Sequence, residues 1–502
     1  MTKRSFLEFF RWSAVAALSV SCLWHGIDSA MAYLGSSDAY AYIADWRAAA
    51  RLAPRGAAAL LCDDASRISP VERSRLIAIA WERAPDPLLA LDASGDMRSV
   101  GCVLSSRWIS PSAAAKLRDG GFSVAAVGEY VKTWVRDGIG PDPSRRCMAD
   151  VSVLRELVAS LAVLTLMLFA FARLSGTRGL DGGAVAAAVS VAALLGAVAL
   201  SHPLLAPNGL GTYGGKAKLL FACGGLPEAF LKSAGGAVLQ PSYPPGLTAL
   251  ALLHFVLSGG CGDRLVQLVV VFAMALLCLG LARKAASPWG ALPAVLYCLS
   301  PTAVRLTSGF YAEPLAALSL LLGWDMIGRG RLFAGALAMG AAGLFRPEAG
   351  AVAAAFVGFA SMREFGFRRS LPAIALSVAP SAGWLAVGRA LGYGQLSDWD
   401  FGAAPNFGQV AYAAWSEAKA LALSALPVAV VAWLVRPRRI PTGNLAASLV
   451  PAALLFLAIP LGCGFYATHS ASWMIDNTVM RIAWYVSVIP LAEFLCHKED
   501  EL

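Results

Sequence analysis

Ionisable and aromatic side chains interrupt the apolar segments of this sequence at four places. The interruptions read GTYGGKAKLL with QPSYPPG, then SGFYAEP, then LFRPEAG, and finally HSASWMIDNTVMRIAWYVSVIP. The residues in them that could do chemistry are Lys216, Tyr243, Glu313, Arg346, Glu348 and Arg481. Arginine binds phosphate through two parallel hydrogen bonds, and a carboxylate can act as a general base. Two cations and two anions facing one cavity would therefore suit a phosphate-bearing lipid and a hydroxyl acceptor.

Taken singly, each of these residues also has a structural explanation. Arg346 could extend its charge to a membrane surface, and Glu313 could pair with Arg305. Ionisable groups at membrane depth are nevertheless costly, which makes them functional candidates by default.

Composition places these residues in a membrane protein. The chain has 502 residues, of which 58% are hydrophobic and only 15% charged, and its mean hydropathy is +0.62. Soluble proteins carry roughly 25% charged residues, so this chain cannot cover its apolar surface with a polar shell. A soluble enzyme and a disordered protein are thereby excluded. The apolar runs are continuous, whereas the strands of an outer-membrane barrel alternate apolar and polar residues.

The net charge of +9 is also explained by a membrane protein. The cations form short clusters between apolar runs, as the positive-inside rule requires of a protein that crosses the membrane many times. The sequence therefore predicts no nucleic-acid partner.

The apolar runs predict about 12 transmembrane helices with both termini in the cytoplasm of the cell. The first run follows Lys3, Arg4 and Arg11 and is expected to be an uncleaved helix. A further run at 244–258 is about 15 residues long, which is short for a crossing, and we expect a shallow or re-entrant helix there. The predicted spans are about 13–34, 152–173, 183–201, 266–283, 289–306, 312–327, 332–346, 349–362, 371–392, 416–435, 445–463 and 481–496.

Three parts are expected: an N-terminal transmembrane helix (1–34), an extracytoplasmic α/β insert (35–150) and a multi-span membrane domain (151–502). Alternating elements within 51–135 favour a small α/β sandwich. Its predicted strands are 57–62, 88–92, 99–106 and 123–128, and its predicted helices are 73–84 and 110–120. The first and last of these strands are expected to be buried. No cysteine or histidine spacing in the chain matches a zinc site.

The order SYPPG, FYAEP, FRPEAG and W-x10-W with Arg481 resembles the polytopic GT-C glycosyltransferases, in particular those similar to dolichyl-phosphate-mannose mannosyltransferases. The resemblance covers about 183–496 and implies an all-α, GT-C-like membrane domain. It implies a hexosyl transfer with inversion, from a polyprenyl-phosphate carrier to a glycan, lipid or protein acceptor on the outer face of the membrane. Many members use an acidic residue in the first outer loop as the base, sometimes with a divalent metal ion. The Ala- and Arg-rich composition, without organelle signals, predicts a bacterial inner membrane.

The resemblance implies a role for each candidate residue. Arg346 and Arg481 would hold the carrier phosphate, with Lys216 as a third cation. Asp38 or Glu313 would be the catalytic base. Tyr243, Glu348 and Asp400 would contact the substrates, Asp400 from the acceptor side together with Asp398.

The sequence departs from the family at one point. The acid expected just before Lys216 is absent, and Gly211, Thr212 and Tyr213 stand there. Asp38 is one substitute, although an aspartate at a helix start is also an ordinary N-cap, and Glu228 is another. Without either, the protein would bind a sugar lipid without transferring it.

Three other functions stay open. A polymerase or ligase of lipid-linked polymers would share the phosphate site. A transporter would show inverted repeats and a midplane site, and the sequence contains no evident repeat. A non-catalytic scaffold would recruit partners through 35–150.

Overall fold

The computed structural model describes residues 3–34, 37–52, 57–62, 70–83, 88–91, 97–139, 151–175, 181–201, 208–226, 243–284, 291–390, 405–435, 442–463 and 471–496. The described residues form two compact units. The first is drawn from 1–33, 164–199 and 268–502, and the second from 34–163 and 200–267.

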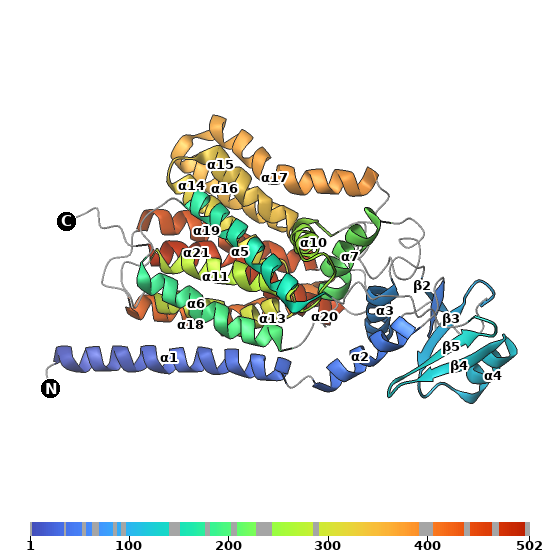
Figure 1. The fold of residues 1–502 in the computed structure, drawn as a ribbon. Helices are drawn as coiled ribbons and strands as arrows, with labels where there is room; N and C mark the ends of the chain where they lie inside the picture. Colours follow the sequence, from blue (N-terminus) through green and yellow to red (C-terminus); the bar gives the residue numbers. More distant parts are fainter. Residues whose placement is uncertain are drawn as a thin grey trace. The chain divides into compact units, whose positions relative to one another are not determined.

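Helices build the first unit. They are α1 (Lys3–Leu34), α6 (Gly182–Leu200), α11 (Leu268–Ala282), α12 (Ala291–Cys298), α13 (Pro301–Ser308), α14 (Glu313–Gly328), α15 (Leu332–Gly340), α16 (Ala349–Phe365), α17 (Phe367–Ala390), α18 (Phe407–Val435), α19 (Thr442–Cys463), α20 (Ala471–Val486), α21 (Val488–Leu495) and the second half of α5 (Val153–Ser175). A 3-10 turn, η4 (Ala341–Leu344), follows α15. Helices α11 and α14 are apolar around nearly their whole circumference, which explains why both are buried. Figure 1 shows α14, α15 and α16 side by side, and the three helices are in mutual contact.

Among the described residues, seven helices are long and apolar enough to cross a membrane. They are Arg11–Met31, Val153–Ser175, Gly182–Leu200, Leu265–Ala282, Phe367–Ala390, Phe407–Leu434 and Thr478–Leu495. The chain is therefore a membrane protein with several transmembrane helices.

The prediction of about 12 spans is not confirmed. Helices α13 and α14 bend by 115° at the break between them, and counting them as one span raises the total to eight. The predicted span at 332–346 is a nine-residue helix, α15, that continues as the 3-10 turn η4. Apolar composition marks such segments as membrane-embedded, but hydropathy does not reveal where a helix breaks.

Helices α14 and α15 approach each other through two glycines. A Cβ on Gly323 would lie 2.5 Å from the carbonyl oxygen of Gly335, and a Cβ on Gly335 would lie 2.7 Å from the carbonyl oxygen of Gly323. Small residues allow helix backbones to pack this closely in membranes. This contact braces the helix that begins at Glu313 against the helix that leads to Arg346.

Gly323→Ala is expected to destabilise the protein by about 1–3 kcal/mol, because the new methyl group meets Met339 Cγ at 2.3 Å. Gly328→Ala, on the same helix, meets nothing within 4 Å and serves as the matched control. Its expected effect lies between zero and a gain of about 1 kcal/mol, because alanine favours the helix over glycine. Unfolding midpoints of the two purified variants in one detergent measure the difference. Equal midpoints would contradict the close helix contact.

The second unit contains a five-stranded mixed sheet in the order β2-β1-β3-β5-β4. The strands are β1 (Ala58–Leu61), β2 (Leu88–Leu91), β3 (Cys102–Ser106), β4 (Phe122–Val127) and β5 (Val131–Arg136). β1 pairs in parallel with β2 and β3, whereas β5 is antiparallel to β3 and β4. Figure 1 shows α4 (Pro111–Asp119) beside the sheet, and its Leu117 packs with Ala59, Val103 and Trp134.

The predicted strands and helices of the insert are all present, with two differences. The segment 123–128 was expected to be a buried strand, but β4 is an edge strand whose Val124 and Val127 side chains are exposed. That prediction was wrong because it omitted β5, which takes the position beside β3 and leaves β4 at the edge. The strand β5 was omitted because Lys132 and Arg136 obscure its apolar pattern.

Further helices complete the second unit. They are α2 (Ser37–Leu52), α3 (Pro70–Arg83), α7 (Gly214–Cys223), α10 (Gly246–Ser258) and the first half of α5, with the π-helical turn η1 (Asn208–Tyr213) and the 3-10 turn η2 (Leu265–Gln267). α10 has 13 residues, so it is shorter than an ordinary crossing, as expected for 244–258.

Buried cations hold these helices together. Lys218 of α7 donates a hydrogen bond to the carbonyl oxygen of Trp81 in α3. Arg47 of α2 pairs with Asp263 at 2.6 Å. These contacts explain why residues 200–267 belong to the same unit as the α/β insert.

Candidate functional site

A sharp bend in the first unit places an acidic residue at the start of a buried helix. α13 ends at Ser308 and α14 begins at Glu313, with an angle of 115° between their axes. Between them, the fully buried Phe310 has a φ of 54°, a left-handed conformation that a bulky residue seldom adopts. Such backbone conformations persist only where the surrounding packing enforces them. The bend therefore holds Glu313 at the positive end of the α14 dipole, which suits a carboxylate.

Glu313 pairs with two arginines that come from distant parts of the chain. Its side chain is 0% exposed, and its Oε1 atom lies 3.4 Å from Arg346 Nε and 3.3 Å from Arg481 Nη1. Arg346 lies in the turn between η4 and α16, and Arg481 lies on α20. The pairing gathers three of the predicted site residues around one oxygen atom.

A fourth predicted residue completes the cluster. Arg346 donates from Nε and Nη2 to Glu348 Oε1, at 2.9 Å and 2.5 Å. The Glu348 side chain is 30% exposed, whereas the side chains of Arg346 and Arg481 are 4% and 8% exposed. Glu348 is therefore the open side of an otherwise buried cluster of two guanidinium and two carboxylate groups.

Two tyrosines, neither of them among the predicted site residues, line the same cluster. The Arg481 guanidinium lies 5.1 Å from the centre of the Tyr311 ring. Tyr485 is buried one helical turn after Arg481 and interacts electrostatically with all four charged groups. Its hydroxyl has no hydrogen-bond partner among the described residues. The sequence could have indicated Tyr485 by its spacing, because it follows Arg481 by four residues and residues four apart lie on one face of a helix.

The buried end of α20 is rigidly packed. The ring of Trp484 stacks on Tyr297 of α12 at 5.0 Å with an angle of 9° between the planes. The Tyr297 hydroxyl donates a hydrogen bond to the carbonyl oxygen of Trp484. These contacts fix the helix turn that carries Arg481 and Tyr485.

Two further predicted residues meet in the second unit. Lys216 of α7 is 4% exposed, and its Nζ donates a hydrogen bond to the carbonyl oxygen of Tyr243 at 2.9 Å. The rings of Tyr213 and Tyr243 meet edge to face at 6.3 Å. A Cβ on Gly214 would lie 2.4 Å from the carbonyl oxygen of Gly209, so the turn into α7 requires glycine there. Burial lowers the pKa of Lys216 to about 7.

A lysine with this lowered pKa would bind an anion with an affinity that depends on pH near neutrality. Below a pKa of about 7 the amine is charged, and above it the amine is neutral. Affinity for a phosphodiester, whose own charge is constant in this range, is expected to fall about tenfold between about pH 6 and pH 8. The measurement is a binding isotherm at each pH, with Lys216→Met as the control. The methionine variant should bind weakly at every pH, and a flat wild-type profile would contradict the assignment.

The other predicted site residues are not among the described side chains. Asp38 falls in the first turn of α2, and its side chain lies outside the described residues. Asp398, Asp400 and Glu228 also lie outside them.

The side chains of the first-unit cluster do not suit a divalent metal ion. Its two carboxylates are both engaged by Arg346, and a cation there would face two arginines. Within the described ranges, no group of three or more His, Cys, Asp or Glu residues could hold a metal.

Comparison of the chain with protein-family models, curated proteins and solved structures finds no match.

Proposed function

We propose that this protein is a membrane glycosyltransferase that moves a sugar from a polyprenyl-phosphate carrier to an acceptor on the extracytoplasmic face. One observation carries the proposal: Arg346 and Arg481 converge on buried Glu313 within a unit built of apolar helices. Charged groups at such a position are costly and need a functional reason. Two preorganised guanidinium groups supply one, because they fit the phosphate of a lipid carrier.

The half-open pair of Arg346 and Glu348 supports this assignment. A phosphate oxygen can replace Glu348 Oε1 as the partner of Arg346 Nε and Nη2, because the Glu348 side chain is 30% exposed and can turn toward solvent once it is displaced. When the sugar leaves, negative charge develops on the carrier phosphate. Fixed guanidinium groups in a low-dielectric site stabilise that charge without reorganising.

Glu313 and Asp38 are the two acids proposed as the base. Glu313 has no exposed surface and pairs with both arginines, which favours a role in positioning them. We therefore assign the base role to Asp38, which would take the proton of the acceptor hydroxyl while the sugar configuration inverts. Glu313 would keep the arginines in place and balance their charge before the carrier binds.

A second function has its own support. Among the described residues, the two carboxylates of the cluster are Glu313 and Glu348, and Arg346 pairs with both. The cluster itself therefore offers a phosphate site without an available base. A protein that binds the carrier lipid without transferring its sugar would need no more than this.

The test is binding and turnover of polyprenyl-phosphate sugars by the purified full-length protein in lipid, with Asp38→Asn beside the wild type. Turnover by the wild type that is lost in Asp38→Asn, with carrier binding retained in both, is the result we expect. Binding without turnover in the wild type would select the binding-only function. Neither binding nor turnover would overturn the carrier-lipid proposal.

A further inference from the structure

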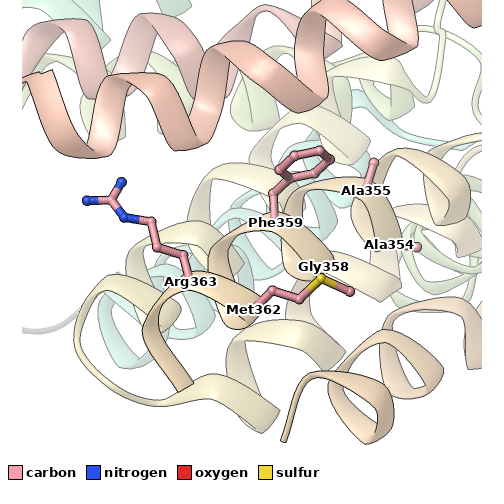
Figure 2. A pocket seen from close by; sticks show the side chains of 6 residues that line it. All are labelled: Ala354, Ala355, Gly358, Phe359, Met362 and Arg363. Carbon is pink, nitrogen blue, oxygen red and sulfur yellow. The ribbon is translucent and has the colours of Figure 1, made fainter. Parts of the chain in front are cut away.

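Side chains on one face of helix α16 line an open apolar groove. The groove has a volume of about 600 Å³ and is lined by Ala354, Ala355, Gly358, Phe359, Met362 and Arg363. These positions recur every three to four residues, so they form one stripe along the helix. Figure 2 shows Phe359 and Arg363 projecting from the same side of α16.

The groove has the profile expected for a hydrocarbon chain. Alanine and glycine form its floor, and Phe359 and Met362, which are 39% and 50% exposed, form its walls. Small residues let a chain lie close to the helix backbone, and a methionine side chain adapts to an irregular ligand. The volume lies within the range of roughly 300–1,000 Å³ that is usual for small-molecule sites.

One end of the groove is cationic. Arg363 lies in the last turn of α16, and Arg368 and Arg369 follow in the first turn of α17, all three exposed. The neighbouring Glu364 is the single acid in this stretch of the sequence, so the turn is net positive. α17 is one of the candidate membrane spans, which places its first residues at a membrane surface.

An apolar groove that ends in cations at a membrane surface matches an anionic phospholipid. We propose that this groove binds one anionic phospholipid of the surrounding bilayer, with an acyl chain along α16 and its phosphate at Arg363, Arg368 and Arg369. Charge complementarity decides between lipids, because every phospholipid supplies acyl chains but only an anionic one supplies a net negative headgroup. The proposal does not depend on the proposed transferase activity.

Native mass spectrometry of the full-length protein, released from nanodiscs of equal phosphatidylglycerol and phosphatidylcholine, tests the proposal. The wild type should retain phosphatidylglycerol at least fivefold more than phosphatidylcholine, and Arg363→Ala should lower that preference about fivefold, roughly the effect of one surface cation. Arg389→Ala, an exposed arginine at the far end of α17, is the control and should leave the preference unchanged.

A second pair of variants tests the groove itself. Ala355→Leu fills it and should reduce retention of the bound lipid, whereas Ala351→Leu, at an exposed position of α16 outside the groove, should not. Equal retention of the two lipids by the wild type would overturn the proposal. So would a preference that survives both Arg363→Ala and Ala355→Leu. Displacement of phosphatidylglycerol by polyprenyl phosphate would also overturn it, by showing that the groove belongs to the carrier.

Discussion

Arg346→Gln is expected to lower sugar transfer from the carrier by at least about 100-fold, the usual loss when one preorganised donor to a developing negative charge is removed. Arg346 is the residue that reaches both carboxylates of the cluster, at 3.4 Å to Glu313 and 2.5 Å to Glu348. Glutamine keeps much of the side-chain length but has neither the charge nor the two parallel donors. Turnover measured in lipid at saturating carrier reports the effect.

Two further variants separate catalysis from folding in this experiment. Arg305→Gln removes an exposed arginine of α13 and should leave turnover unchanged. The double variant Arg346→Gln/Glu313→Gln removes one cation and one anion, so the remaining charges balance, and it should be more stable than Glu313→Gln while turnover stays low. Turnover that returns together with stability would contradict phosphate binding and leave Arg346 as a structural residue.

Glu313→Ala is expected to cost about 3–5 kcal/mol of stability, because it leaves two buried guanidinium groups without the carboxylate between them. The Glu313 side chain is 0% exposed, whereas Glu348 is 30% exposed and contacts Arg346 alone of the two arginines. Glu348→Ala should therefore cost no more than about 1 kcal/mol, as expected for a pair that water can reach. Thermal unfolding of both variants in one detergent makes the comparison.

The test depends on the difference between the stability losses of Glu313→Ala and Glu348→Ala. A large loss in Glu313→Ala with a small loss in Glu348→Ala supports a buried charge network built around Glu313. Equal losses would contradict that network. Glu313→Gln adds a check, because it keeps the side-chain shape and should lose stability through charge alone.

Several features of the fold were predictable from sequence alone because they depend on local pattern. Continuous apolar runs identified a membrane protein, since no soluble chain of this composition could cover its surface. Alternating short strands and amphipathic helices predicted the α/β insert, and its four predicted strands correspond to β1, β2, β3 and β4. The strand β5 was missed because two cations interrupt its apolar pattern.

The number of spans was less predictable, for a physical reason. Hydropathy reports which residues avoid water, and a helix that bends at Phe310 avoids water as well as a straight one does. A transmembrane helix and a broken pair within protein therefore have the same composition.

The sequence by itself determined the residue types of the site and the order in which Lys216, Glu313, Arg346, Glu348 and Arg481 occur along the chain. Only the tertiary structure decided that Glu313 receives both arginines, that Glu348 is the open side, and that Tyr485 joins them. Lys216 and Tyr243, which lie in one interruption of the sequence, meet in the second unit through a hydrogen bond from the Lys216 amine to the Tyr243 backbone carbonyl oxygen. Contacts between residues more than a hundred positions apart depend on how helices bend and pack, and no local pattern encodes those angles.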